Sequence, residues 1–197
     1  MAGGGAVRRV ARSAGAVLAI AAAMLVGAAV DRTHAGGGMT PGLAAGGVPL
    51  SANVETVRRI LGEPSDELKD PSNAQIFIQR WENHCLGARY TPLGGLLALD
   101  VWFDVGKACP GLGYAVEGRG GEAVGFADKR ADVKRVFGYQ PDRVLRAPRF
   151  TIFVYEGEGI AFYIREGGDR DGRVDVMTVF SPTTSRTVWS LAAWGGR

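Results

Sequence analysis

The sequence predicts an α+β fold of two tandem units, each a helix followed by antiparallel strands, with the helices on one face of the sheet. Three observations lead to this prediction. The segment that begins at Val48 recurs at Val124, and the offset of 76 residues is kept up to Gly62 and Gly138. In the first part of each copy, apolar residues recur at spacings of three and four, as on one side of a helix. Alternating apolar and polar residues follow, and this succession of helices and strands is typical of α+β proteins.

The first 35 residues predict a secretory signal peptide. Arg8, Arg9 and Arg12 precede the uncharged stretch from Ala14 to Val30, which is 17 residues long, and small side chains at Thr33-His34-Ala35 offer a cleavage site. The alternative is an uncleaved anchor, because about 17–25 apolar residues can span a bilayer. Both interpretations place the rest of the chain in the periplasm or outside the cell.

The net charge of +3 belongs to the predicted signal peptide. Cleavage after Ala35 removes four arginines and one aspartate, which leaves equal numbers of basic and acidic residues. A neutral chain lacks the excess of positive charge that draws proteins to nucleic acids. We therefore expect no nucleic-acid partner, and membrane contact only if the N-terminal segment stays attached.

Residues 36–47 are rich in glycine, alanine and proline and predict a flexible linker. Repeat unit 1 then spans residues 48–118, repeat unit 2 spans residues 119–183, and residues 184–197 form a C-terminal tail.

The helix of each unit has expected start and stop residues. Ser51 and Asp128 carry side chains that cap helix N-termini. Gly62 and Gly138 are each followed by a proline within three residues, which is typical of a helix end. The inward-facing residues are expected to be Val54, Val57, Ile60 and Leu61 in the first helix and Val133, Val136 and Phe137 in the second.

Strands follow each helix. In unit 2 they are expected over residues 150–156, 159–165 and 173–180, joined by glycine-containing turns. In unit 1 they are expected over residues 75–82, 97–105 and 113–117. Residues 86–96 form an insertion that unit 2 lacks.

The phrases from Val57 to Pro64 and from Val133 to Gly138, each followed by a strand meander, resemble the SmpA/OmlA domain of outer-membrane assembly lipoproteins. Two such copies in one exported chain resemble the architecture of β-lactamase inhibitory proteins. The resemblance implies that both units form one continuous sheet with the helices behind it. It also implies a protein that binds other proteins. The chain departs from the lipoprotein pattern because no cysteine follows the apolar N-terminal stretch.

Cys85 and Cys109 are the two cysteines of the chain. An even number of cysteines in an exported protein predicts a disulfide bond. The alternative is a reactive or metal-binding thiol beside His84, which lacks a supporting cluster of bases or ligands in the sequence.

Five aromatic residues are expected to share one face of the sheet and to form a contact surface, because aromatic side chains are favoured binding anchors. They are Trp81, Trp102, Phe153, Tyr155 and Tyr163. The alternatives are that the tail or the inserted loop covers this face, or that a different register exchanges the two faces. The opposite face is expected to form the core with residues Ile76, Ile78, Leu99, Val101, Phe103, Ile152, Val154, Ile160, Phe162 and Ile164.

We expect no catalytic residue, metal site or cofactor. The sequence contains no G-x-S-x-G, H-E-x-x-H or Walker motif. Asp100 and Asp104 would lie about 13 Å apart on one strand, too far for a retaining glycosidase pair. Asp169, Asp171 and Asp175 lack the spacing of a calcium loop and predict a hairpin turn instead.

These observations together predict an exported, non-enzymatic protein-binding or scaffold module of the cell envelope. Its partner would be another protein or an envelope component. One alternative is a secreted inhibitor of a hydrolase that inserts residues 88–95 into a cleft. The other is an unrecognised envelope hydrolase that uses Asp100, Asp104 and His84.

Overall fold

The computed structural model describes residues 38–70, 73–103 and 114–184. All of them belong to one compact unit of the chain, His34–Arg197. The predicted signal peptide, and all but Thr184 of the predicted tail, lie outside the described residues.

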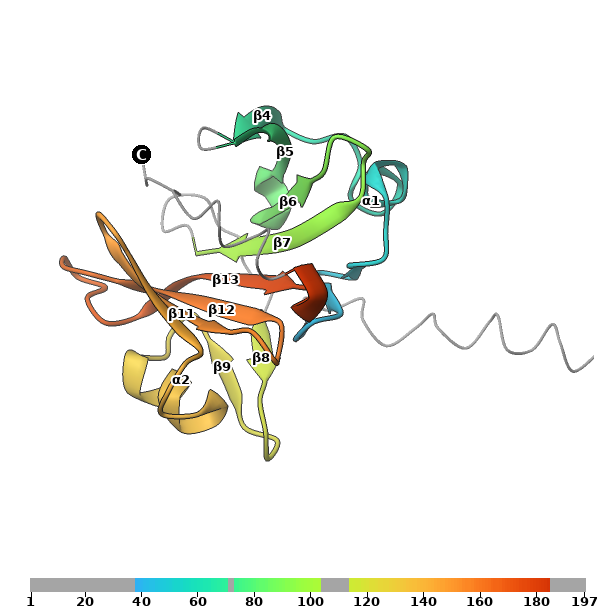
Figure 1. The fold of residues 1–197 in the computed structure, drawn as a ribbon. Helices are drawn as coiled ribbons and strands as arrows, with labels where there is room; N and C mark the ends of the chain where they lie inside the picture. The colour runs from blue at the N-terminus through green and yellow to red at the C-terminus, as the bar shows by residue number, and fades with distance from the viewer. Residues whose placement is uncertain (1–37, 71–72, 104–113, 185–197) are drawn as a thin grey trace, which may run out of the picture. The chain divides into compact units, whose positions relative to one another are not determined.

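The larger of two sheets has eight strands, all antiparallel to their neighbours, in the order β10-β11-β12-β13-β7-β6-β5-β4. It consists of two four-stranded meanders that meet where β13 pairs with β7 (Figure 1). The strands are β4 (Asp66–Asp70), β5 (Asn73–Trp81), β6 (Leu86–Tyr90), β7 (Leu96–Trp102), β10 (Arg143–Ala147), β11 (Phe150–Tyr155), β12 (Ile160–Arg165) and β13 (Val174–Phe180).

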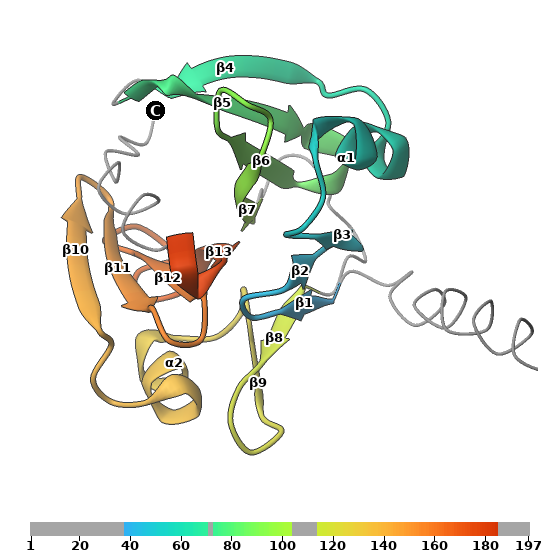
Figure 2. The ribbon, with the colours of Figure 1, turned by 45° about the vertical axis from the view of Figure 1, so that its right-hand side comes forward.

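The smaller sheet has five short strands in the order β3-β2-β1-β8-β9, which lie side by side in Figure 2. They are β1 (Met39–Thr40), β2 (Ala44–Ala45), β3 (Val48–Pro49), β8 (Ala115–Glu117) and β9 (Ala123–Gly125). The described part of the predicted flexible linker is therefore folded, and Met39 and Ala45 are buried. The prediction of a flexible linker is wrong for these residues because the glycines form a turn: Gly46 and Gly47 have positive φ angles of 58° and 77°.

Two α-helices precede the two meanders, α1 (Val54–Leu61) and α2 (Arg130–Phe137). The predicted ends at Gly62 and Gly138 are confirmed, and both glycines have positive φ. Short 3-10 helices follow β5 (η1, Glu82–His84) and β13 (η2, Pro182–Thr184).

The predicted N-caps are wrong by one or two residues. Asn53, not Ser51, caps α1, and its Oδ1 accepts a hydrogen bond from the Thr56 N–H at 2.9 Å. Lys129, not Asp128, is the N-cap position of α2, and its N–H donates to Asp132 Oδ2 at 3.0 Å.

The three strands predicted for unit 2 are confirmed to within one residue as β11, β12 and β13. The prediction for unit 1 is wrong in two places. The supposed insertion contains β6, an interior strand of the larger sheet, and the third predicted strand contains β8, which belongs to the smaller sheet. The two edge strands of the larger sheet, β4 and β10, were not predicted from the sequence.

The predicted α+β class is wrong, because the described residues form thirteen strands but only two α-helices of eight residues each. They form two sheets, so the expectation of one sheet with helices packed on one face is wrong as well. The main core combines side chains of both sheets and both helices, including Val48, Val116, Val57 and Val133. Strands of two or three residues are too short to show a period, so the sequence held no signal for the second sheet.

Candidate functional site

The five aromatic residues predicted to form a contact surface do not share a face. Directly paired residues of neighbouring strands point to the same side of a sheet. Phe153 pairs with Phe162, whereas Tyr163 pairs with Ile152, so Phe153 and Tyr163 lie on opposite faces. Trp81, Phe153, Tyr155 and Tyr163 are all buried, and Trp102 is partly buried. The predicted aromatic contact surface is therefore wrong.

Trp81 and Tyr155 instead complete the ends of the helices. The Trp81 Nε1–H donates to the carbonyl oxygen of Gly62 at 2.9 Å, and the Tyr155 hydroxyl donates to that of Gly138 at the same distance. The last carbonyls of a helix lack partners within the helix, so each bond satisfies an otherwise unpaired acceptor. The two residues thus have the same role, one in each half of the larger sheet.

Tyr163 belongs to a buried polar cluster on the other face. Arg89 and Asp100 form a two-pronged ion pair, with both nitrogen–oxygen distances at 2.8 Å. Thr178 Oγ1 donates to Asp100 at 2.6 Å, and Arg89 reaches the Tyr163 hydroxyl at 3.4 Å. Burial opposes the charged form of Arg89, but charge attraction and hydrogen bonds with Asp100 and Tyr163 together outweigh it and raise the pKa of the guanidinium. Asp100 is a structural residue in this arrangement.

The other residues of the hydrolase alternative do not join Asp100. Asp104 lies outside the described residues, and His84 ends η1, where its backbone oxygen accepts a hydrogen bond from the Tyr114 hydroxyl at 3.0 Å. Cys85 is buried, with a φ of 45°. Cys109 lies outside the described residues, so the Cys85–Cys109 disulfide stays a prediction.

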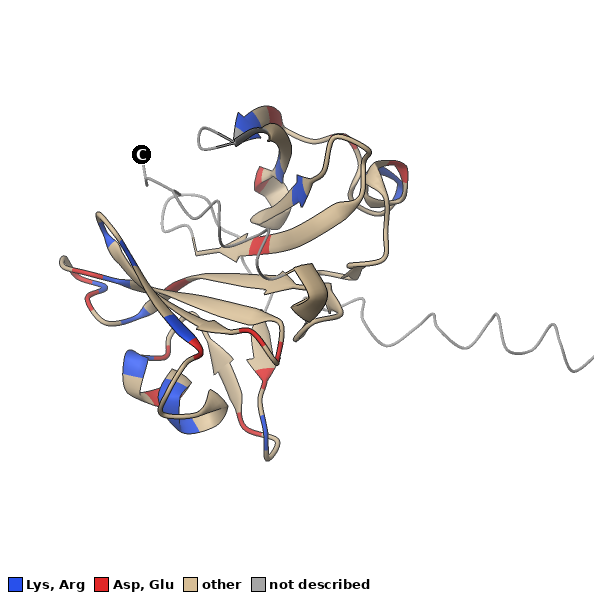
Figure 3. Ribbon diagram, viewed as in Figure 1, with Lys and Arg blue, Asp and Glu red and all other residues tan. Residues whose placement is uncertain are grey.

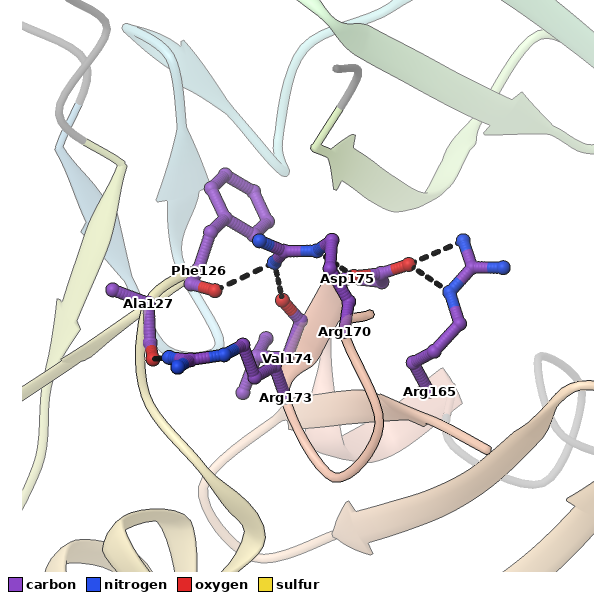
Figure 4. Close-up of polar contacts among 7 residues, drawn as sticks. All are labelled: Phe126, Ala127, Arg165, Arg170, Arg173, Val174 and Asp175. Atoms are coloured by element: carbon purple, nitrogen blue, oxygen red, sulfur yellow. Dashed lines mark hydrogen bonds and ion pairs between the residues drawn. The ribbon is translucent and has the colours of Figure 1, made fainter. Parts of the chain in front are cut away.

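Two aspartates of this region, Asp171 in the β12–β13 connection and Asp175 in β13, accept bonds from protein donors, and Figure 4 shows those of Asp175. Asp175 forms ion pairs with Arg165 and Arg170. Asp171 Oδ1 accepts a hydrogen bond from the Gly167 N–H at 2.6 Å, as expected for a hairpin turn. Within the described residues, no group of three or more metal-binding side chains is present.

The arginines of this region tie the β12–β13 connection to the segment before α2. Arg170 donates to the Phe126 carbonyl at 2.7 Å and lies 3.8 Å over the Phe103 ring. Arg173 donates to the Ala127 carbonyl, as Figure 4 shows. Because these donors serve the fold, the cluster has a structural role.

The strongest candidate site is a groove at the end of α2, which we call the turn groove. It lies between the β1–β2, β8–β9 and β11–β12 turns and the connection from α2 to β10. It has two adjoining parts of about 490 and 540 Å³ that share the residues Arg119, Phe137, Gly157 and Glu158. The first part, which we call the apolar lobe, is further lined by Pro41, Gly42, Leu43, Glu117, Gly118 and Pro182. The second part, which we call the polar lobe, is further lined by Gly138, Tyr139, Gln140, Asp142 and Tyr155.

Close backbone contacts hold the walls of the turn groove in place. The Gly42 N–H donates to the Gly159 carbonyl at 3.2 Å, which joins the β1–β2 turn to the β11–β12 turn. A Cβ atom on Gly159 would lie 2.6 Å from Gly42 Cα. A Cβ atom on Gly118 would lie 2.4 Å from Val136 Cγ1 of α2. Only glycine permits these approaches, so the walls of the groove are closely packed.

Large apolar side chains stand exposed in both lobes, Leu43 at 65% and Tyr139 at 77%. In Figure 3, charged residues lie on both helices, on strand connections and on strands such as β4 and β7. Among those that line the groove, three are carboxylates (Glu117, Asp142 and Glu158) and one is a guanidinium (Arg119). The groove is therefore net acidic, and it combines apolar surface with a few polar groups, as ligand sites do.

Tyr155 forms part of the polar lobe and makes the stability of the fold sensitive to alkaline pH. Burial, and then the negative charge of Asp142, raises the pKa of Tyr155 to about 12. Above pH 10 the unfolded chain loses the phenolic proton while the folded protein keeps it, so stability falls as the pH rises from 10 towards 12. Stability below pH 10 is unaffected by this linkage.

We expect Tyr155→Phe to lower the free energy of unfolding by about 1 kcal/mol at pH 7, because the Gly138 carbonyl loses its donor. The variant should also lose less stability than the wild type between pH 10 and 12. Urea unfolding at pH 7, 10 and 11.5 measures both effects. Equal alkaline losses in the two proteins would contradict the assignment. Tyr139→Phe is the control, because that side chain is mostly exposed.

Local sequence patterns did not reveal the turn groove. They predicted a turn between residues 156 and 159 and placed the boundary between the two repeat units beside Arg119. No local pattern shows that these two segments meet, since they lie 39 residues apart and join through tertiary structure.

The described residues include no helix that is both long and apolar enough to cross a membrane.

No known protein-family model matches the sequence, and no curated protein matches it either. Among solved structures, the chain is similar to a DUF4309 family protein, YjgB, from Bacillus subtilis. The identity is 13%, the TM-score is 0.40, and the match covers 66% of this chain and 78% of the other. A likeness at this level carries no argument about function.

Proposed function

We propose that this protein is an exported, non-enzymatic binding module that holds a segment of another protein in the turn groove. The observation that carries the proposal is the partly apolar groove with Leu43 and Tyr139 exposed in its two lobes. Export to the periplasm or the cell exterior rests on the predicted signal peptide. The resemblance to SmpA/OmlA domains and β-lactamase inhibitory proteins likewise stays a prediction.

The dimensions of the groove favour a polypeptide partner. Each lobe, at about 500 Å³, has room for two or three side chains but is small for a folded domain. Exposed leucine and tyrosine side chains are costly to leave in water, and tyrosine is enriched among residues that dominate binding energy. Turns carried on a sheet are a common place for binding surfaces.

The chemistry of the groove favours binding over catalysis. The described residues that line it include no histidine, cysteine, serine or lysine, so they offer neither a Ser–His nor a Cys–His pair. Asp142 accepts a hydrogen bond from the Glu156 N–H at 2.6 Å, and Glu158 is paired with Arg119.

A photo-crosslinking amino acid placed at position 43 or 139 tests the proposal in the native host. We expect both positions to capture the same protein, because one segment would cross both lobes. The control position is Leu93, which is 97% exposed but lies on the β6–β7 turn and does not line the groove. Capture at neither groove position, or equal capture of that protein at position 93, would overturn the proposal.

A second candidate function is inhibition of a secreted hydrolase through the β6–β7 turn. The turn is held by hydrogen bonds between Thr91 and Gly95, including Gly95 N–H to Thr91 Oγ1 at 3.1 Å, and it presents Leu93 at its tip. A rigid turn with one exposed apolar side chain can enter a cleft at low entropic cost. Capture of a hydrolase at position 93 alone would favour this function.

A further inference from the structure

We propose that Glu158 binds a basic side chain of the partner polypeptide, next to an apolar side chain of the partner that lies in the apolar lobe. In the protein without its partner, Arg119 forms the ion pair with Glu158. This inference rests on the proposed function and names the chemistry of the partner. On binding, a lysine or arginine of the partner would replace Arg119 in the ion pair with Glu158.

Glu158 has the right place for such an anchor. It lines both lobes, and its side chain is 29% exposed, so it is accessible but partly shielded from water. Its position is well defined, since the adjacent Gly159 is pressed against Gly42 and the Phe180 carbonyl. A fixed and partly shielded carboxylate attracts a cation more strongly than a fully solvated one does.

The contact between Arg119 and Glu158 has the properties of an exchangeable pair. Arg119 Nε donates to Glu158 Oε1 at 2.8 Å, and its terminal nitrogen contacts the same oxygen. No other described residue donates to the second oxygen, Oε2, so the carboxylate has room for a two-pronged partner. The Arg119 side chain is 81% exposed, and exposed pairs contribute only about 0.2–1 kcal/mol.

The surroundings select a positive charge beside an apolar group. Once Arg119 moves away, the lining retains three carboxylates, Glu117, Asp142 and Glu158, and no cation. Pro41, Leu43 and Pro182 give the neighbouring lobe an apolar wall. Charge complementarity therefore favours a segment in which a basic residue and an apolar residue are adjacent.

The test uses the dipeptide N-acetyl-Leu-Arg-amide as a probe, with N-acetyl-Leu-Glu-amide as the charge control. Binding is measured from amide chemical shifts of the purified protein during titration. We expect the Leu-Arg probe to shift groove residues and the Leu-Glu probe to shift none. Arg119→Gln should bind Leu-Arg about two- to five-fold more tightly, which is the value of one exposed pair. Glu158→Gln should bind it at least ten-fold more weakly than Arg119→Gln does.

Arg135→Gln is the matched control variant. It removes a guanidinium from an exposed pair with Glu122 outside the groove and should leave the affinity unchanged. Equal affinities of wild type, Arg119→Gln and Glu158→Gln, or the absence of binding by all of them, would overturn the inference. Photo-crosslinking at positions 43 and 139 separates the two proposals. Capture that persists undiminished in Glu158→Gln would leave the proposed function standing while rejecting the basic anchor.

Discussion

Asp100→Ala will lower the free energy of unfolding by about 3–5 kcal/mol, the loss typical of a broken buried ion pair. Asp100 is 2% exposed and accepts hydrogen bonds from Arg89 and Thr178. Its removal leaves the buried Arg89 guanidinium without a counter-charge, in a place that water does not reach. Urea unfolding followed by tryptophan fluorescence measures the loss.

Glu122→Ala is the control for this prediction, because it removes a carboxylate from an exposed pair and should cost under about 1 kcal/mol. The double variant Arg89→Met/Asp100→Leu should recover part of the loss, since it removes both charges together. A loss for Asp100→Ala no larger than that of the control would contradict a stabilising role of the buried ion pair.

Gly159→Ala will lower the free energy of unfolding by about 2–5 kcal/mol, which combines overpacking with a left-handed backbone. The added Cβ would lie 2.3 Å from the Phe180 carbonyl oxygen and 2.6 Å from Gly42 Cα, and the φ of Gly159 is 69°. The backbone atoms on both sides cannot give way cheaply, so the β1–β2 turn must shift. Thermal or urea unfolding measures the loss.

Gly157→Ala provides a matched control two residues away in the same turn. A Cβ at Gly157 would meet nothing within 4 Å, and we expect a change below about 1 kcal/mol. Because the β1–β2 turn carries Leu43, Gly159→Ala should also reduce photo-capture at position 43 more than at position 139. Equal stabilities of the two alanine variants would contradict the close packing of the turns.

Local sequence patterns predicted several elements well. The second meander is built from alternating residues with glycine-containing turns, and its strands β11, β12 and β13 lie where the alternation placed them. Gly62 and Gly138 end the helices as expected, because a positive φ followed by a proline is a local property of the chain. Trp81 and Tyr155 each donate a hydrogen bond to the carbonyl oxygen of one of those glycines.

The prediction of the fold class was wrong because short strands pair with partners that are distant in the sequence. β1 pairs in parallel with β8, which lies more than 70 residues further along the chain. Neither strand is long enough to show a periodic pattern in the sequence, so the glycine-rich segment was predicted to be a linker. β6 was mistaken for part of an insertion for a related reason, since all five of its residues are buried and it shows no alternation.

The sequence by itself determined the turn between β11 and β12, the C-terminal ends of the two helices and the strands β11, β12 and β13, because each depends on interactions between residues close in the chain. Only the tertiary structure decided which face each aromatic residue occupies, since a change of one residue in register exchanges the two faces. It also decided that Asp100 is a buried partner of Arg89 and that Arg119 meets Glu158 in the turn groove. The Arg119–Glu158 contact joins turns that lie 39 residues apart, and the Arg89–Asp100 pair depends on the pairing of β6 with β7, so neither follows from a local pattern.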